Sequence, residues 1–169
     1  MEILKYVLPS VIVFITVYFV LKLFLDNQQK KQELEIKANT SKIIIPMRLQ
    51  SFERLILLME RITPNNLIIR VHSKGFSAKQ MQILLLQNIR NEFEHNLAQQ
   101  MYVSSDAWQL ILNAKEEMIK IINTSATKLN NDAKSHDLNT LILEQSVIFK
   151  KFPTIQAIEV LKKEVRELF

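Results

Sequence analysis

The residues that come nearest to a metal or acid–base centre in this sequence are Glu92 and His95. They form a Glu-x-x-His pair, and a spacing of three places both side chains on one face of a helix. Di-iron carboxylate bundles use this pair, but they need a second copy and a glutamate from each of two further helices. No glutamate stands three residues before His72 or His136. We therefore expect a surface or interhelical hydrogen bond at this position, and we predict no metal site and no cofactor.

The chain lacks the residues and motifs on which most enzyme sites are built. It contains no cysteine, which excludes thiol nucleophiles and thiolate metal sites. Its single glycine, Gly75, excludes the glycine-rich phosphate loops, and neither a G-x-S-x-G nor an H-E-x-x-H motif occurs. We predict that the protein is not an enzyme.

Four arginines could bind an anionic ligand. They are Arg48, Arg54, Arg61 and Arg70, and they alternate with acids. Guanidinium groups bind carboxylates and phosphates bidentately, so this region could recognise a lipid headgroup or a nucleotide. Alternatively, the arginines form ion pairs with internal acids such as Glu92 and Glu116. We favour the internal pairs and keep the anionic ligand as the alternative.

Aromatic residues offer a second kind of interaction surface. Tyr102, Val103 and Trp108 surround a predicted helix start, and the chain ends in Leu168–Phe169. If they are exposed, they form a docking patch. A domain rich in Leu and Ile could equally use them in its core. The candidate interaction surface therefore comprises Arg48, Arg54, Arg61, Arg70, Tyr102, Trp108 and Phe169.

The elements that carry these residues are predicted to be helices. Apolar residues recur at helical spacing from Phe52 to Ile62 and from Met81 to Leu97. Ser77 and Gln80 form a capping box, Ser104 or Ser105 caps the next helix, and Pro153 opens the last one. With a loop over residues 130–137, residues 43–169 are expected to form a compact bundle of five or six helices.

Three local predictions accompany this bundle. A helix is expected to start at Pro46, because the residue before a proline avoids the α region. Residues 101–103 are expected to form an extended link, and a helix is expected over about 138–151. Leu67–Val71 is rich in β-formers, but a lone strand would have no partner, so we favour a helix there.

The N-terminal stretch is predicted to be a transmembrane anchor. Residues 6–25 are almost entirely apolar, and about 20 such residues make ~30 Å of helix, the hydrocarbon thickness of a bilayer. A cleaved signal peptide is the alternative, but a positive n-region and a small-x-small cleavage pattern are absent. We expect an anchor over 1–25, a helical stalk over 26–42 and the bundle over 43–169.

The distribution of basic residues predicts the orientation. Only Lys5 precedes the span, whereas Lys22, Lys30, Lys31 and Lys37 follow it or lie at its end. The positive-inside rule then places the N-terminus outside and the bundle in the cytoplasm. Without Lys5, Lys22 and Glu2, residues 26–169 carry 20 Lys and Arg against 16 Asp and Glu. This mild excess suits an anionic membrane surface and is too diffuse for nucleic acid.

Several strings together carry a resemblance to a known family. They are SKIIIPMRLQSFERLILLMERITPNNLIIRV (Ser41–Val71), EFEHNLAQQMYVS (Glu92–Ser104) and NAKEEMIKIIN (Asn113–Asn123). With them the chain resembles, over essentially its whole length, an uncharacterised family of single-span, membrane-anchored helical proteins of Bacteroidota. The resemblance implies a bacterial inner-membrane setting and transfers no activity, ligand or partner.

The predicted function follows from the anchor and the bundle. We expect a non-enzymatic, membrane-anchored interaction protein, an accessory or scaffold subunit of an inner-membrane complex for transport, secretion or energy transduction. Its expected partners are the lipid bilayer and other membrane subunits. A homo-oligomer is compatible with the sequence, although small-xxx-small spacing is absent from the span.

Overall fold

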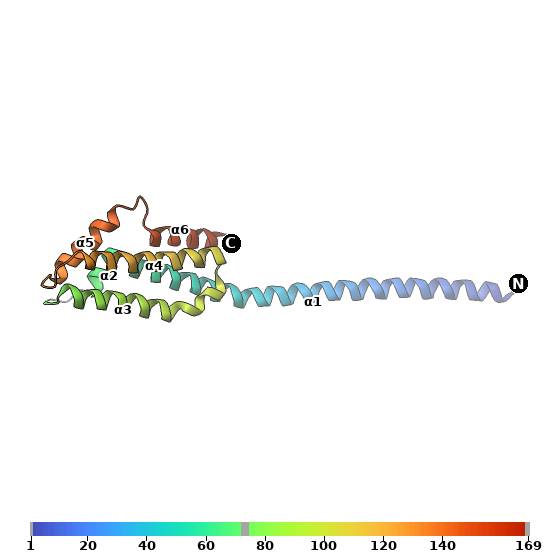
Figure 1. Ribbon diagram of the computed structural model, residues 1–169. Coiled ribbons are helices and arrows are strands. Elements are labelled where there is room, and N and C mark those ends of the chain that lie inside the picture. The colour runs from blue at the N-terminus through green and yellow to red at the C-terminus, as the bar shows by residue number, and fades with distance from the viewer. Residues whose placement is uncertain (1, 72–74, 168–169) are drawn as a thin grey trace. The chain divides into compact units, whose positions relative to one another are not determined.

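Every regular element is a helix within the residues that the computed structural model describes. These are residues 2–71 and 75–167 for the backbone, and 12–71 and 75–167 for the side chains. The elements are α1 (Glu2–Ile62), α2 (Pro64–Val71), α3 (Ala78–Asn96), the 3₁₀ helix η1 (Leu97–Tyr102), α4 (Ser105–Thr127), α5 (Ser135–Val147) and α6 (Pro153–Arg166) (Figure 1). The described residues form no strand, only one isolated bridge between Ser77 and Lys134. The all-α fold is confirmed, and Leu67–Val71 is helical.

The chain divides into two compact units, residues 1–46 and 47–169, with the boundary inside α1. In unit 1 the apolar side chains from Ile12 to Leu25 are all exposed. Among the described residues, no helix contains a segment both long and apolar enough to cross a membrane. Residues 6–11 of the predicted span lie outside the side chains that are described.

The helix start predicted at Pro46 is wrong, because α1 runs from Glu2 to Ile62 and includes this residue. A proline inside a helix removes one hydrogen bond to the carbonyl four residues earlier. Here that carbonyl belongs to Lys42, which is exposed, so water can satisfy it. The cost of the proline is therefore smaller than it would be in a buried helix.

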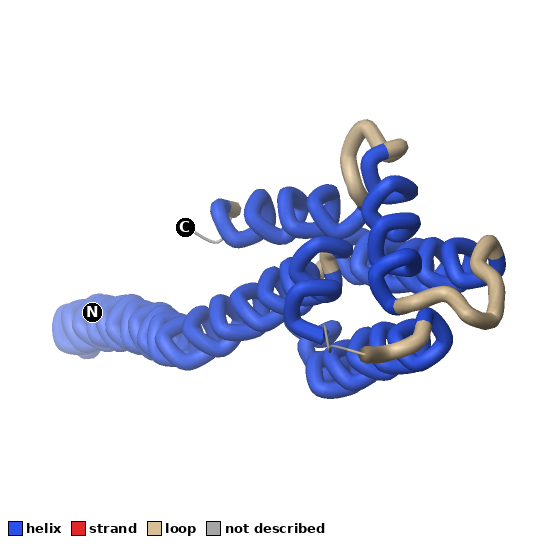
Figure 2. Tube along the Cα trace, turned by 90° about the vertical axis from the view of Figure 1, so that its left-hand side faces the viewer, coloured by secondary structure: helices blue, strands red, loops and turns tan. Residues whose placement is uncertain are grey.

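Unit 2 has a continuous apolar core built around α4. This helix packs against α3, α5 and α6, and Figure 2 shows the helices and the loops between them in separate colours. The largest fully buried side chains come from the last turns of α1 and from α2, α3 and α4: Phe52, Leu55, Leu58, Met59, Ile62, Leu67, Met81, Leu85, Ile89, Ile111, Met118 and Ile122. The apolar faces predicted from Phe52 to Ile62 and from Met81 to Phe93 are thus confirmed, whereas Leu97, the last residue of the second predicted face, is 45% exposed.

Local sequence signals set most helix starts. The Ser77 hydroxyl accepts from Gln80 N at 3.2 Å, and the Ser77 N–H donates to the Gln80 side chain at 3.0 Å, which completes the predicted capping box. Ser104 caps α4 by accepting from Ala107 N at 3.1 Å. Pro153 is the first residue of α6. The two serines satisfy backbone N–H groups that a helix start leaves free, whereas Pro153 fits the first position because it has no backbone N–H.

Two predictions near helix ends are wrong. Met101 and Tyr102 belong to η1 and not to an extended link. α5 begins at Ser135 and ends at Val147, so it starts and stops about one turn before the predicted range of 138–151. The displacement at its C-terminal end leaves residues 148–152 in a loop before α6.

Candidate functional site

Glu92 of α3 joins two of the predicted arginines. Arg61 Nη1, at the end of α1, donates to both Glu92 carboxylate oxygens, at 3.3 and 3.1 Å. Arg70 Nη1, at the end of α2, donates to Glu92 Oε1. The Glu92 side chain is only 15% exposed, so the charge is held in a partly desolvated position. Three helices therefore meet at one carboxylate, and Arg61 and Arg70 form the internal pairs that the sequence suggested.

The two arginines change the acidity of Glu92. Partial burial by itself raises the pKa of this carboxyl group, because it disfavours the charged form. Hydrogen bonds and positive charge from Arg70 and Arg61 outweigh burial and hold the pKa below its ordinary value of 4.5. Glu92 is consequently ionised at neutral pH and neutralised by its partners.

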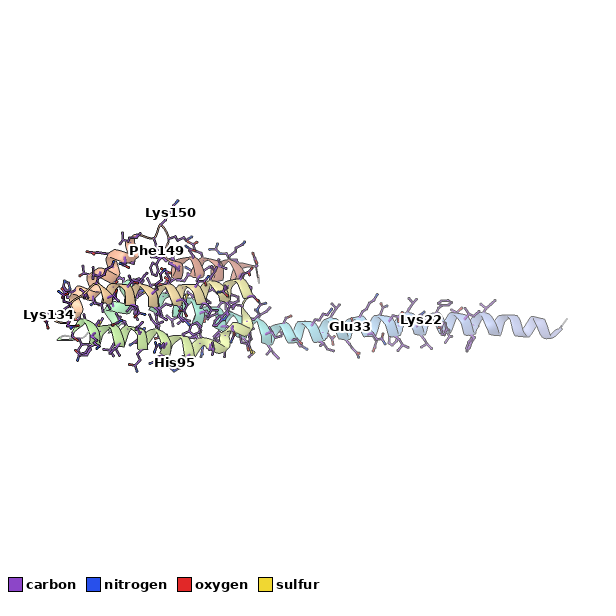
Figure 3. All side chains as sticks on the ribbon, in the orientation of Figure 1. Lys22, Glu33, His95, Lys134, Phe149 and Lys150 are labelled. Atoms are coloured by element: carbon purple, nitrogen blue, oxygen red, sulfur yellow. The ribbon has the colours of Figure 1, made fainter. Side chains whose placement is uncertain are left out.

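Two of the arginines and the Glu92–His95 pair, which are separate candidates in the sequence, line the same cleft. Arg54, Arg61, Glu92 and His95 surround a cleft of about 440 Å³, together with Leu57, Leu58 and Asn96. Figure 3 shows His95 on the outer side of α3. Because the Glu92 carboxylate is engaged by two guanidinium groups, it is not free to bind a metal with His95. Arg54 makes no ion pair among the described residues, and it remains the cation available in this cleft.

The other predicted interaction residues lie elsewhere. Arg48 is half-buried and does not line the cleft. Trp108 packs against Phe93 with ring centroids 5.5 Å apart, and Lys115 Nζ lies 4.4 Å from the Phe93 centroid. The core thus uses much of Trp108, and Tyr102 is half-buried. Phe169 lies outside the described residues.

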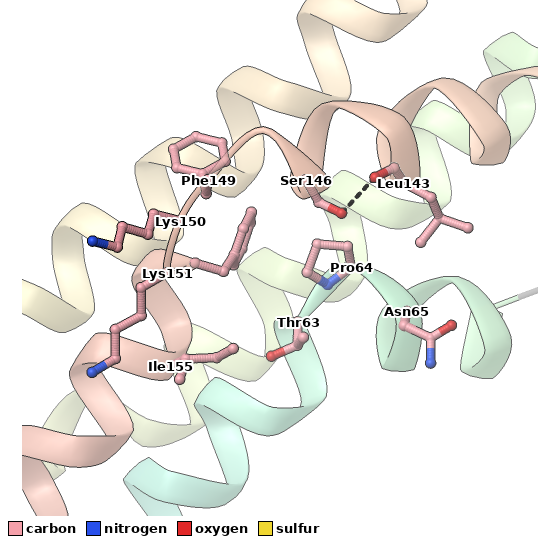
Figure 4. Close-up of a pocket in the computed structure, with 10 residues that line it drawn as sticks. Thr63, Pro64, Asn65, Leu143, Ser146, Phe149, Lys150, Lys151 and Ile155 are labelled. Atoms are coloured by element: carbon pink, nitrogen blue, oxygen red, sulfur yellow. Dashed lines mark hydrogen bonds between the residues drawn. The ribbon is translucent and has the colours of Figure 1, made fainter.

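A second cleft, which the sequence did not reveal, lies under the loop between α5 and α6. It measures about 320 Å³ and is shown in Figure 4. Its lining is mostly apolar with hydroxyl, amide and ammonium groups at the edge: Thr63, Pro64, Asn65, Leu143, Ser146, Phe149, Lys150, Lys151, Phe152 and Ile155. The combination suits an amphipathic ligand or surface better than a small polar substrate.

Two inward-facing rings hold this loop in place. Phe149 and Phe152 meet edge to face with centroids 5.3 Å apart, and Phe152 is buried. Gln156 Nε2 donates to the Lys151 carbonyl at 3.0 Å, and Lys151 pairs with Glu159. Below the loop, the Thr63 and Thr154 hydroxyl oxygens lie 2.9 Å apart. The loop is therefore a packed structure with defined inner and outer sides.

The outer side of the loop is apolar and basic. Val147 and Ile148 are each 81% exposed, more than any other large apolar side chain described in unit 2. Lys150 follows them, and Figure 3 shows its side chain pointing away from the bundle. The signal in the sequence is VIFKKF (Val147–Phe152). It was hidden because most of this run fell inside the predicted helix over 138–151.

Comparison with known proteins identifies a family and does not identify an activity. No curated protein and no solved structure shows detectable similarity to this chain. A family model described as a family of unknown function, DUF7935, matches residues 1–168. Since the match spans nearly the whole sequence, the chain belongs to the DUF7935 family.

Proposed function

We propose that the protein is a non-enzymatic scaffold or accessory subunit, anchored in a bacterial inner membrane by one N-terminal span. Residues 1–25 form the anchor, 26–42 the stalk and 43–169 the binding domain. The N-terminus lies outside and the helical domain faces the cytoplasm. The setting in Bacteroidota follows from the resemblance of the chain to membrane-anchored proteins of that phylum.

The exposure of apolar residues in unit 1 carries this proposal. From Ile12 to Leu25 the large apolar side chains are between 47% and 74% exposed, and they occupy every side of the helix. A helix that is apolar all round is stable only in a protein core or in lipid. Together with residues 6–11, this run reaches about 20 residues, which is the length a bilayer requires.

Co-purification at native expression level tests the proposal most directly. The tagged protein is extracted in mild detergent, and the proteins that elute with it are identified by mass spectrometry. We expect the chain in the membrane fraction, resistant to alkaline carbonate, with other membrane subunits in stoichiometric amounts. A chain that carbonate releases, or that elutes without partners, contradicts the anchor or the subunit role respectively.

A matched pair of variants isolates the anchor. Replacing Val13 and Val17 with Asp puts two charges in the apolar run, at about 2.5–3.5 kcal/mol each near the centre of a bilayer. The same change at Leu34 and Ile36, which are more exposed than Val13 and Val17 but lie among polar residues, leaves the run intact. We expect only the first variant to leave the membrane fraction. Equal behaviour of the two variants would contradict the anchor.

Binding of an anionic ligand in the cleft between α1 and α3 is the second candidate function. The observation that favours it is Arg54, which lines that cleft beside the neutralised Glu92 and carries no internal partner among the described residues. Replacing Arg54 with Ala should weaken binding of an anionic lipid headgroup or a nucleotide while the fold persists. Unchanged binding by a folded R54A variant excludes this function.

A further inference from the structure

Exposed apolar side chains and positive charge lie together where α5 ends and the loop to α6 begins. Val147, the last residue of α5, and Ile148, the first residue of the loop, are consecutive branched apolar residues and are each 81% exposed. Exposed single apolar residues are common and need no explanation. An adjacent pair where α5 ends is different, because the packing of Phe149 and Phe152 holds the following loop in place and leaves the pair exposed.

The charge of the same segment is positive. Between Glu144 and Glu159 the sequence contains Lys150 and Lys151 and no acidic residue. Lys151 pairs with Glu159 across one side of α6, whereas Lys150 makes no ion pair among the described residues. Figure 4 shows both ammonium groups extending on the same side of the loop. The free charge therefore lies two residues from the exposed apolar pair.

We propose that residues 147–152, the last residue of α5 and the loop that follows it, insert Val147 and Ile148 into the surface of an anionic lipid bilayer while Lys150 binds the headgroup phosphates. Burial of apolar side chains at the boundary between headgroups and acyl chains, with basic residues at the headgroups, is how interfacial segments bind anionic membranes. The partly apolar cleft lined by Leu143, Phe149 and Ile155 lies beneath the loop, and neither Val147 nor Ile148 lines it. Unit 2 thus has its own lipid contact.

This contact is distinct from the N-terminal anchor, although it rests on the proposed membrane setting. An anchor only confines the helical unit near a membrane. A second contact through the loop fixes which side of that unit faces the lipid. The cleft lined by Arg54, Arg61 and Glu92 takes no part in this contact.

A single fluorescent label detects whether the loop contacts lipid. The chain has no cysteine, so Ile148→Cys gives one labelling site for an environment-sensitive dye. The labelled full-length protein is reconstituted into phosphatidylcholine vesicles with or without phosphatidylglycerol. We expect a blue-shifted emission, protected from a water-soluble quencher, only when phosphatidylglycerol is present. Ile83→Cys on α3, 56% exposed in the wild type, is the matched control and should stay water-exposed in both lipids.

A charge variant tests the contribution of Lys150 to lipid binding. Adding Lys150→Gln to the labelled protein removes one headgroup contact, worth about a fivefold change in equilibrium constant. The ratio of lipid-shielded to water-exposed label should fall by about that factor. Both positions are exposed, so the variants keep the core, and the fluorescence of Trp108 verifies the fold.

Three outcomes overturn the inference. The first is a label at position 148 that stays water-exposed on anionic vesicles. The second is shielding that occurs in native membranes but not in pure lipid, which would indicate a protein partner for the loop. The third is a chain that does not float with the vesicles, which removes the membrane setting as well. Flotation thus separates failure of the proposed function from failure of the loop contact.

Discussion

Arg61 and Glu92 are 31 residues apart in the sequence, and their side chains meet with Nη1 of Arg61 3.1 Å from Oε2 of Glu92. The contact joins the last turn of α1 to α3, and Arg70 brings α2 to the same carboxylate. An ion pair that is shared in this way holds three helix ends in register. It also means that two of the four arginines are already occupied in the folded protein.

Replacing Glu92 with Gln should destabilise unit 2 by about 1–2 kcal/mol, because both guanidinium groups lose their charged acceptor. The measurement is urea unfolding of the full-length protein in mild detergent, followed by the fluorescence of Trp108. This residue is the only tryptophan in the chain and it lies in unit 2. The control is Glu94→Gln, an exposed position on the same helix with no ion pair among those described. Equal losses in the two variants would rule out a special role for the shared pair.

The stability that Glu92 contributes should depend on pH with a definite sign. Its folded-state pKa is lowered relative to its ordinary value of 4.5, so the unfolded chain takes up a proton first as the pH falls. The contribution is fully present above pH 4.5 and is lost as the pH falls through the folded-state pKa. The difference in unfolding free energy between wild type and E92Q should therefore be constant at neutral pH and shrink in acid. A difference that persists at the lowest pH would contradict the assignment.

The cap of α4 gives a test at neighbouring serines. Ser104 accepts from Ala107 N and also donates to Glu164 of α6, whereas Ser105 is exposed and is the first residue of α4. Ser104→Ala should cost about 1–2 kcal/mol, and Ser105→Ala should change stability by less than about 0.5 kcal/mol. Thermal unfolding of the two variants, monitored by Trp108, distinguishes them. A larger loss for Ser105→Ala would show that the cap is misassigned.

The core of unit 2 gives a matched pair on α3. Leu85 is fully buried, while Ile83 is 56% exposed. Leu85→Ala should destabilise the protein by about 2–5 kcal/mol, because it removes buried methyl groups and leaves a cavity. Ile83→Ala should have an effect within about 0.5 kcal/mol. Urea unfolding curves compare the two, and a similar cost for both would mean that another surface covers Ile83.

The sequence predicted the helices well where a local signal was strong. The Ser77–Gln80 capping box, the Ser104 cap and Pro153 each act within a few residues, so their effect does not depend on distant contacts. The apolar periodicity from Phe52 to Ile62 predicted a buried face for the same reason. A prediction failed where it depended on a local rule whose energetic effect is small at that position. Pro46 did not end α1, since the carbonyl that it leaves free is exposed to water.

The candidate sites were predicted only in part, because each depends on residues far apart in the chain. The sequence offered Glu92 both as the partner of His95 and as one of several acids for the arginines. Only the packing of α1, α2 and α3 selected Arg61 and Arg70 as its partners. The same packing placed Arg54 and His95 in one cleft, and it turned Trp108 toward Phe93.

The sequence alone determined the helical class, most helix starts and the apolar N-terminal run, because composition, caps and periodicity act locally. The tertiary structure decided which apolar residues remain exposed. Val147 and Ile148 lie in a run that reads equally well as part of a helix, and α5 ends there while Phe149 and Phe152 pack into the core. Whether the helix continues or the two rings pack into the core depends on the free energy of packing against distant residues. Spacing along the chain does not encode that free energy.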